Sequence, residues 1–252
     1  ALQLPFVQVV RDPSLYPHDP LVATLSAYCS WYWVAVAHLG GDDPAGLLLV
    51  LFLLTNAGRL VAAAGVARAM FPQSRLAPWA AAALWAMGPR PLMDAGTLMS
   101  PYAEQSATAV VFLLWAFQAL LGDRPLWWAL CFAAGFLLNP MYGVYAATYF
   151  GLVALVLLAK RSLSVGWLWA AGAAGVLVVP SVIWSVRTMH GLEGGTAADV
   201  ILWVQVAEAR LAGHLFPLRW EWLSFVWHTL VLVGVIAVGI GLQIGIGDQE
   251  NL

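Results

Sequence analysis

The chain has 252 residues, of which 62% are hydrophobic and only 10% are charged. Soluble domains carry about 25% charged residues, so this chain has too little polar surface for a globule in water, and lipid is the solvent that its composition fits. The formal net charge of -2 provides no basic stripe and argues against a nucleic-acid partner.

The first 40 residues divide into a polar and an aromatic part. Residues 1–20 contain four prolines and are predicted to form an extended or turning loop. Leu21–Leu39 is apolar, and its cluster of Trp31, Tyr32 and Trp33 suits the lipid headgroup level. We predict an in-plane helix or a short span there. Because the first residue is Ala, we expect a window on a longer chain, with an upstream helix and a downstream region outside it.

The rest of the chain alternates apolar segments with short polar loops. A bilayer core requires about 20 apolar residues, and the segments of that class are Ala45–Phe71, Glu104–Leu121, Met141–Ala159, Val165–Val186 and Leu223–Ile246. Two shorter segments, Ala77–Met87 and Leu126–Leu138, reach only part of the way across, and the second stops at Asn139-Pro140. Polar loops are expected at 88–103 and at 187–222, the latter with an amphipathic segment, Ala198–Leu211.

These segments predict an all-α, polytopic integral membrane bundle of about seven embedded helices of uneven length plus an interfacial helix. All of it forms a single transmembrane domain: an external loop and interfacial helix at 1–43, transmembrane helices at 44–186, an external loop at 187–222 and a last helix at 223–252. The positive-inside rule favours an orientation in which short inner loops carry Arg68, Arg75, Arg124, Lys160 and Arg161. Residues 1–20 and 187–222 then face the outside, which is the periplasm if the membrane is a bacterial inner membrane.

Three polar loops collect on that outer side. The first reads RDPSLYPHDP, in which Asp12 and Asp19 flank His18 and each Asp precedes a proline. Rigidly presented carboxylates can bind Mg²⁺ or Mn²⁺, with His18 as a further ligand, or one can act as a general base. The competing interpretation is turn formation, which Asp-Pro commonly starts.

The other two loops contain basic groups. In GPRPLMDAGTLMSPYAE, Arg90 and Asp94 can pair with each other, whereas Ser100, Pro101 and Glu104 suit the start of a helix. The late loop contains ARLAGHLFPLRWEW, which provides Arg210, His214 and Arg219 for a phosphate. The alternative for the late loop is a basic interfacial segment anchored by tryptophans.

One charge lies deep within a span. Asn56 and Arg59 are three residues apart and share a helix face. An arginine at that depth faces a cavity or a partner, so Arg59 is either a ligand-binding group or a structural one. The sequence has no P-loop, GxSxG, HExxH or dinucleotide-binding motif.

The phrases DPSLYPHDP, SPYAE, NPMYG and RLAGHLFP together resemble landmarks of the C-type membrane glycosyltransferases, the GT-C superfamily. The resemblance implies an uneven helical bundle with an outer-face site and a polyprenyl-phosphate sugar as donor. It also implies that Asp12 or Asp19 is the catalytic carboxylate and that Arg210 and His214 contact the lipid phosphate.

Three functions are therefore open. The first is sugar transfer from a polyprenyl-phosphate donor, in which Arg59, Arg90, Arg210, His214 and Arg219 bind the substrate. The second is a non-catalytic subunit of a larger membrane complex, which the small-residue segments AAAGVARA and AAGAAGVLVV favour. The third is a transporter with interrupted helices.

Overall fold

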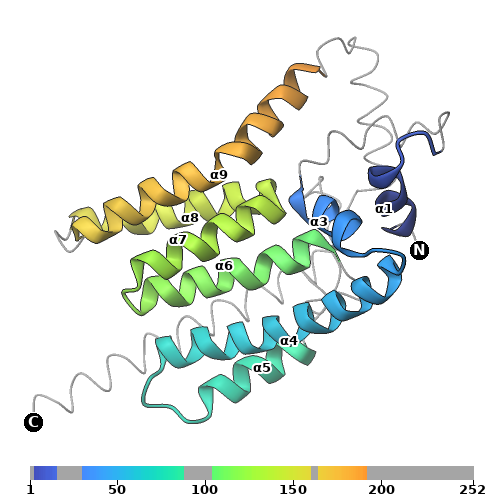
Figure 1. Ribbon diagram of the computed structural model, residues 1–252. Helices are drawn as coiled ribbons and strands as arrows, with labels where there is room; N and C mark the ends of the chain where they lie inside the picture. Colours follow the sequence, from blue (N-terminus) through green and yellow to red (C-terminus); the bar gives the residue numbers. More distant parts are fainter. Residues whose placement is uncertain (1–2, 16–29, 88–103, 160–163, 192–252) are drawn as a thin grey trace, which may run out of the picture. The chain divides into compact units, whose positions relative to one another are not determined.

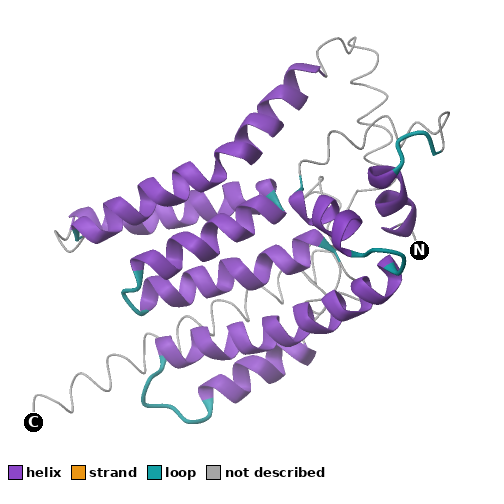
Figure 2. Ribbon diagram, viewed as in Figure 1, coloured by secondary structure: helices purple, strands orange, loops and turns teal. Residues whose placement is uncertain are grey.

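The computed structural model describes residues 3–15, 30–87, 104–159 and 164–191, and every described residue belongs to one compact unit of the chain. Every regular element in these ranges is an α-helix (Figure 2). Two of these helices, over Pro44–Met70 and Val165–Thr188, are long and apolar enough to cross a membrane. The all-helical class is thus confirmed, and the two long apolar helices point to membrane association. The full set of about seven embedded helices stays a prediction.

The elements follow one another as helices of uneven length (Figure 1). In chain order they are α1 (Gln3–Arg11), α3 (Trp31–Leu39), α4 (Pro44–Met70), α5 (Ala77–Met87), α6 (Gln105–Leu121), α7 (Pro125–Leu138), α8 (Pro140–Ala159) and α9 (Val165–Gly191). From α4 to α8 the predicted boundaries agree with the structure to within one residue. The predicted span over Leu223–Ile246 and the amphipathic segment Ala198–Leu211 lie outside the described residues.

Two predictions were wrong, one about the N-terminal loop and one about the end of the helix that starts at Val165. Residues 1–20 were expected to be a loop, yet Gln3–Arg11 is helical, because Pro5 falls in the first turn, where proline is tolerated. Val7 and Val9 are buried, which gives this short helix an apolar face to pack. At the other end, α9 continues to Gly191, so the first residues of the predicted external loop 187–222 extend the helix instead.

Helix ends follow the local sequence. The Asp43 carboxylate accepts a hydrogen bond from the Gly46 amide at 2.8 Å, and Pro44 occupies the first position of α4. A single extended residue, Asn139, separates α7 from α8. Its amide donates to the Gly135 carbonyl at 3.0 Å, its carbonyl accepts from the Gly143 amide at 2.9 Å, and its side chain accepts from the Tyr142 amide at 3.2 Å. The junction is therefore hydrogen-bonded on both sides.

Two apolar clusters hold the helices together. The larger one surrounds Trp128, whose ring stacks on Phe132 at 5.3 Å and meets Phe150 and Trp167 edge-on at 5.6 and 5.7 Å. It joins α6, α7, α8 and α9. The smaller cluster joins α1, α3 and α4 through Val7, Tyr32, Trp33, Val36, Ala37 and Leu48.

Close approach of α4 and α6 depends on glycine. A Cβ at Gly58 would lie 3.0 Å from Val111 Cγ1, and one at Gly65 would lie 2.6 Å from the Gln118 side-chain oxygen. The two helices run in the same direction, since both contacts pair positions of increasing number. This tight packing brings the polar residues of α4 against the first turns of α6.

Candidate functional site

The polar residues of α4 gather on one buried face. Thr55, Asn56 and Arg59 are 6%, 9% and 6% exposed, although they lie within an apolar helix long enough to cross a membrane. The predicted common face of Asn56 and Arg59 is therefore confirmed. A charged residue in such a place normally faces a cavity or a partner, so Arg59 marks the candidate site.

Arg59 stands beside a tryptophan from the neighbouring short helix. Its guanidinium carbon lies 5.7 Å from the ring centroid of Trp85 on α5, which is the geometry of a cation–π contact. Within the part of the chain that the structure describes, Arg59 Nε, Arg59 Nη1 and Trp85 Nε1 are buried without a hydrogen-bond acceptor. These three donors are buried without an acceptor among the described residues, whereas buried polar groups are normally paired.

Trp85 reaches Arg59 because α5 packs against α4. An indole donor from the neighbouring helix thus lies beside the buried cation of α4.

An acid and a phenol act on the same cation. Glu104 and Tyr142 both interact electrostatically with Arg59. Glu104 is the N-cap residue of α6, one position before the first turn in which the sequence placed it, and Tyr142 lies in the first turn of α8. The first turns of α6 and α8 therefore both contribute to the electrostatic environment of Arg59.

A pair of threonines joins α4 to α6 next to this group. Thr55 Oγ1 and Thr108 Oγ1 lie 3.0 Å apart, and the Thr108 hydroxyl also lies 3.0 Å from the Glu104 carbonyl. A hydrogen bond between helices in an apolar setting stabilises their association. Thr55 and Thr108 therefore fix the position of α4 relative to the N-cap residue Glu104.

Asp12 occupies a different position. Its carboxylate is exposed and accepts hydrogen bonds from the Ser14 hydroxyl at 2.6 Å and the Ser14 amide at 3.0 Å, which hold the pKa of Asp12 below its ordinary value of 3.8. This is the turn geometry that Asp-Pro favours. The preceding residue, Arg11, donates to the carbonyls of Ala37 and Gly41, so Asp12 lies near the start of α4. Arg59 is about 22 Å further along that helix, and the structure does not bring the two together.

The other predicted site residues lie outside the described residues. These are His18, Asp19, Arg90, Arg210, His214 and Arg219. Asp12 is thus the one described member of the predicted Mg²⁺ or Mn²⁺ set of Asp12, His18 and Asp19. Within the described ranges no group of three or more His, Cys, Asp or Glu side chains could hold a metal ion.

Sequence reasoning missed several members of the site. Trp85 was not selected, although the short length of its segment was noted and an antiparallel return places it opposite Arg59. Glu104 was assigned a helix-capping role alone. Thr55 and Thr108 carry no motif, and Tyr142 belongs to the NPMYG phrase but was given no role, so only the packing of the helices identifies these three residues.

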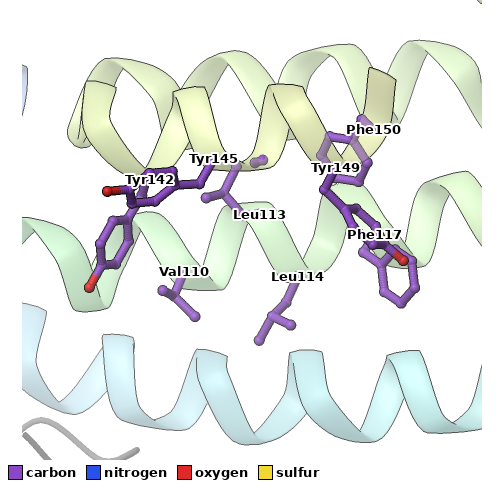
Figure 3. Close-up of a pocket in the computed structure, with 9 residues that line it drawn as sticks. Val110, Leu113, Leu114, Phe117, Tyr142, Tyr145, Tyr149 and Phe150 are labelled. Atoms are coloured by element: carbon purple, nitrogen blue, oxygen red, sulfur yellow. The ribbon is translucent and has the colours of Figure 1, made fainter. Parts of the chain in front are cut away.

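A groove lies between α6 and α8 (Figure 3). Its volume is about 430 Å³, within the range of small-molecule sites. Apolar side chains and the three tyrosines of α8 line it: Val110, Leu113, Leu114, Phe117, Tyr142, Tyr145, Ala146, Tyr149 and Phe150. Tyr142 lines this groove and also interacts electrostatically with Arg59.

Comparison with known proteins found no matching family model, no matching curated protein and no matching solved structure. Inference about function therefore depends on the geometry around Arg59.

Proposed function

We propose that this chain is a membrane glycosyltransferase-like protein that binds the phosphate of a polyprenyl-phosphate sugar at Arg59. The observation that supports the proposal is the buried guanidinium with two unpaired N–H groups, next to the unpaired Trp85 indole. All three are donors, so the group that completes them is an acceptor, and the arginine charge selects an anion. A planar guanidinium fork matches phosphate oxygens.

The membrane setting defines the class of anion. Arg59 lies within an apolar span of the proposed bundle of about seven embedded helices, where a free inorganic anion is poorly soluble. A phosphate attached to a long hydrocarbon reaches that depth without leaving the lipid. The proposed setting is an inner bacterial membrane, with the site opening towards the periplasmic side.

The reaction assigns a role to each charge. An acceptor hydroxyl forms a bond to the anomeric carbon, the bond from that carbon to the phosphate oxygen breaks, and the phosphate keeps the electron pair. Arg59 stabilises the charge that collects on that oxygen. A carboxylate takes the hydroxyl proton. Glu104, which interacts electrostatically with Arg59, and Asp19 are the candidates for this step, because Asp12 lies about 22 Å from Arg59. A Mg²⁺ or Mn²⁺ ion at Asp12, His18 and Asp19 is part of the proposal, as are Arg90, Arg210, His214 and Arg219 at the substrate.

A binding experiment tests the phosphate site. Purified protein is titrated with a polyprenyl phosphate and with the corresponding polyprenol, and Arg59→Lys and Arg59→Gln are compared with Arg68→Lys and Arg68→Gln, which change an exposed arginine of the same helix. We expect wild type and both Arg68 variants to prefer the phosphate. Arg59→Gln should weaken phosphate binding by about ten- to a hundredfold. Equal preference in wild type and Arg59→Gln would exclude Arg59 as the phosphate ligand.

A transfer assay in membranes tests the chemistry. Release of polyprenyl phosphate from a sugar-loaded donor is followed for Asp12→Asn, Asp19→Asn and Glu104→Gln, with and without a chelator. We expect at least one of these variants to lose release while its phosphate binding is kept. If all three retain full transfer, carboxylate catalysis by these residues is wrong.

One observation favours a second function, a non-catalytic subunit of a larger membrane complex. A Cβ added at Gly151, Gly172 or Gly175 would have no atom within 4 Å, so α8 and α9 present uncovered small-residue faces within the described part. Such faces suit close packing of a partner helix. Gly151→Trp and Gly175→Trp should then reduce the size of the complex extracted in mild detergent, and an unchanged size would remove this alternative.

A further inference from the structure

Three separate parts of the sequence meet at one end of the described helices. The α4–α5 turn, the α6–α7 turn and the start of α9 all lie at this end (Figure 1). Gly65 of α4 lies against the Gln118 side chain of α6, so the C-terminal ends of these two helices are neighbours. The Trp167 indole of α9 donates to the Asp123 carboxylate in the α6–α7 turn at 2.8 Å, which brings the start of α9 to the same place.

The charges that the structure describes at this end are mainly basic. They are three exposed arginines and one aspartate, namely Arg68, Arg75, Arg124 and Asp123. Asp123 is engaged with the Trp167 indole, whereas the Arg124 side chain makes no capping hydrogen bond at the start of α7. At the opposite end the balance is reversed, because the exposed acids Asp12, Asp42 and Asp43 outnumber the exposed arginines Arg11 and Arg187.

Exposed tryptophans follow the arginines of the two turns. Trp79 comes four residues after Arg75 and Trp127 comes three residues after Arg124, each in the first turn of a helix that runs back into the bundle. Trp79 and Trp127 are 76% and 49% exposed, and Trp169 near the start of α9 is 76% exposed. With a rise of about 1.5 Å per residue, each indole lies about one turn deeper than its arginine. Tryptophan at such a depth is typical of the membrane–water interface.

The apolar neighbours of these arginines favour a lipid as the partner. Leu76 and Leu126, which lie beside Arg75 and Arg124 in the sequence, are 77% and 68% exposed. Exposed leucine is unfavourable in water, whereas a phospholipid presents an apolar chain and a phosphate at adjacent depths. The length of α4 agrees with this placement: its 27 residues span about 40 Å, more than the ~30 Å hydrocarbon core, so Arg68 in its last turn reaches the headgroups.

We propose that this arginine–tryptophan end, defined by Arg68, Arg75, Trp79, Arg124, Trp127 and Trp169, binds the headgroups of anionic phospholipids in the surrounding leaflet. The guanidinium groups donate to the phosphate oxygens, and the indoles occupy the headgroup level beneath them. The inference is independent of the phosphate site at Arg59, which lies about 16 Å before the end of α4 at Met70.

Binding of phosphatidylglycerol and phosphatidylcholine to the purified protein in neutral detergent micelles tests the surface. We expect wild type to prefer phosphatidylglycerol, and the preference to shrink as salt is raised, because exposed charges are screened. Arg75→Gln combined with Arg124→Gln should lower the preference about thirtyfold, which is about fivefold for each arginine. Arg187→Gln changes an exposed arginine of the opposite end and should leave the preference unchanged.

Three results would each overturn the inference. The double arginine variant could keep the wild-type preference for phosphatidylglycerol, or that preference could be independent of salt. Inorganic phosphate could also displace phosphatidylglycerol from wild type as effectively as unlabelled phosphatidylglycerol does, which would assign the surface to a free anion. The salt series and the phosphate competition use wild type, so they decide the question even if the double variant fails to fold.

Discussion

The guanidinium carbon of Arg59 lies 5.7 Å from the centroid of the Trp85 ring, and both side chains keep buried N–H groups that no described residue accepts. An ion pair or a full set of hydrogen bonds would make Arg59 a structural element. An arginine that is buried and partly unsatisfied instead costs stability, since desolvation of a charge is unfavourable unless it is repaid by partners. The unpaired donors of Arg59 and Trp85 therefore lower the stability of the folded protein, and a ligand that accepted their hydrogen bonds would raise it.

The first prediction concerns stability at this site. Arg59→Met removes the desolvated charge and keeps the bulk of the side chain, so its free energy of unfolding should lie within about 1 kcal/mol of wild type or above it. Phosphate binding should be lost at the same time. Chemical unfolding in detergent micelles measures the first effect, with exposed Arg68→Met as the control. A loss above about 3 kcal/mol would show that Arg59 has a structural partner.

The second prediction concerns the interhelix hydrogen bond between Thr55 and Thr108, whose hydroxyl oxygens lie 3.0 Å apart. Replacing either threonine by valine should cost about 0.6–1.7 kcal/mol, and the double variant should cost less than the sum. A double-mutant cycle on unfolding free energies measures the coupling. Thr148→Val is the matched control, because that exposed hydroxyl donates only within its own helix, to the Val144 carbonyl. Strict additivity would mean that the two hydroxyls do not interact.

The third prediction contrasts two glycines of α8. A Cβ at Gly143 would lie 2.9 Å from the Cα of Phe136 on α7, whereas a Cβ at Gly151 meets nothing within 4 Å. Gly143→Ala should therefore destabilise the fold by about 1–3 kcal/mol through overpacking. Gly151→Ala should be neutral or gain up to about 1 kcal/mol from helix propensity. Thermal unfolding of both variants provides the comparison, and equal losses would contradict the described α7–α8 packing.

The fourth prediction concerns pH. The hydrogen bonds from Ser14 lower the pKa of Asp12 below 3.8 in the folded protein. A depressed folded pKa means that the contribution to stability is fully present above the unfolded pKa and is lost as pH falls through the folded pKa. Ser14→Ala, which removes the stronger of these hydrogen bonds, should flatten the fall of stability below pH 3.8. Unfolding curves recorded from neutral to acidic pH test this. If the slope of unfolding free energy against pH is the same in Ser14→Ala and wild type, Asp12 does not contribute to acid unfolding.

The fifth prediction concerns the turn between α6 and α7. Asp123 adopts a positive φ of 50° and its carboxylate accepts from the Trp167 indole at 2.8 Å. Asn tolerates this backbone and can still accept, so Asp123→Asn should behave like wild type. Asp123→Gly should lose about 1 kcal/mol with the hydrogen bond, and Asp123→Val should lose more because the left-handed backbone disfavours β-branched residues. Melting temperatures ranked in a different order would contradict this account.

Hydropathy and the residues that mark helix boundaries were sufficient to predict most helices. Apolar length located α4 to α9, and Asn139-Pro140 marked a boundary that the structure confirms. The helix α1 was missed because proline count outweighed the apolar positions Val7 and Val9, although a proline in the first turn does not break a helix. Local sequence signals thus predict the presence of a helix more reliably than they predict its absence.

The candidate site was predictable in part. The position of Arg59 within a long apolar segment was visible in the sequence, because a charge in such a segment stands out. Its neighbours Trp85, Glu104 and Tyr142 come from three other helices, and their proximity depends on the pairing and offset of α4, α5, α6 and α8. No local pattern contains that information. Asp12 was selected for its charge, yet its contacts in the structure are those of a turn.

The single-residue junction at Asn139 has a consequence for how α7 and α8 can move. The Asn139 amide donates a hydrogen bond, and its carbonyl oxygen and its side-chain oxygen each accept one. Because no loop separates the two helices and the backbone between them is held from both sides, α7 and α8 should shift together as a rigid pair when the bundle is deformed.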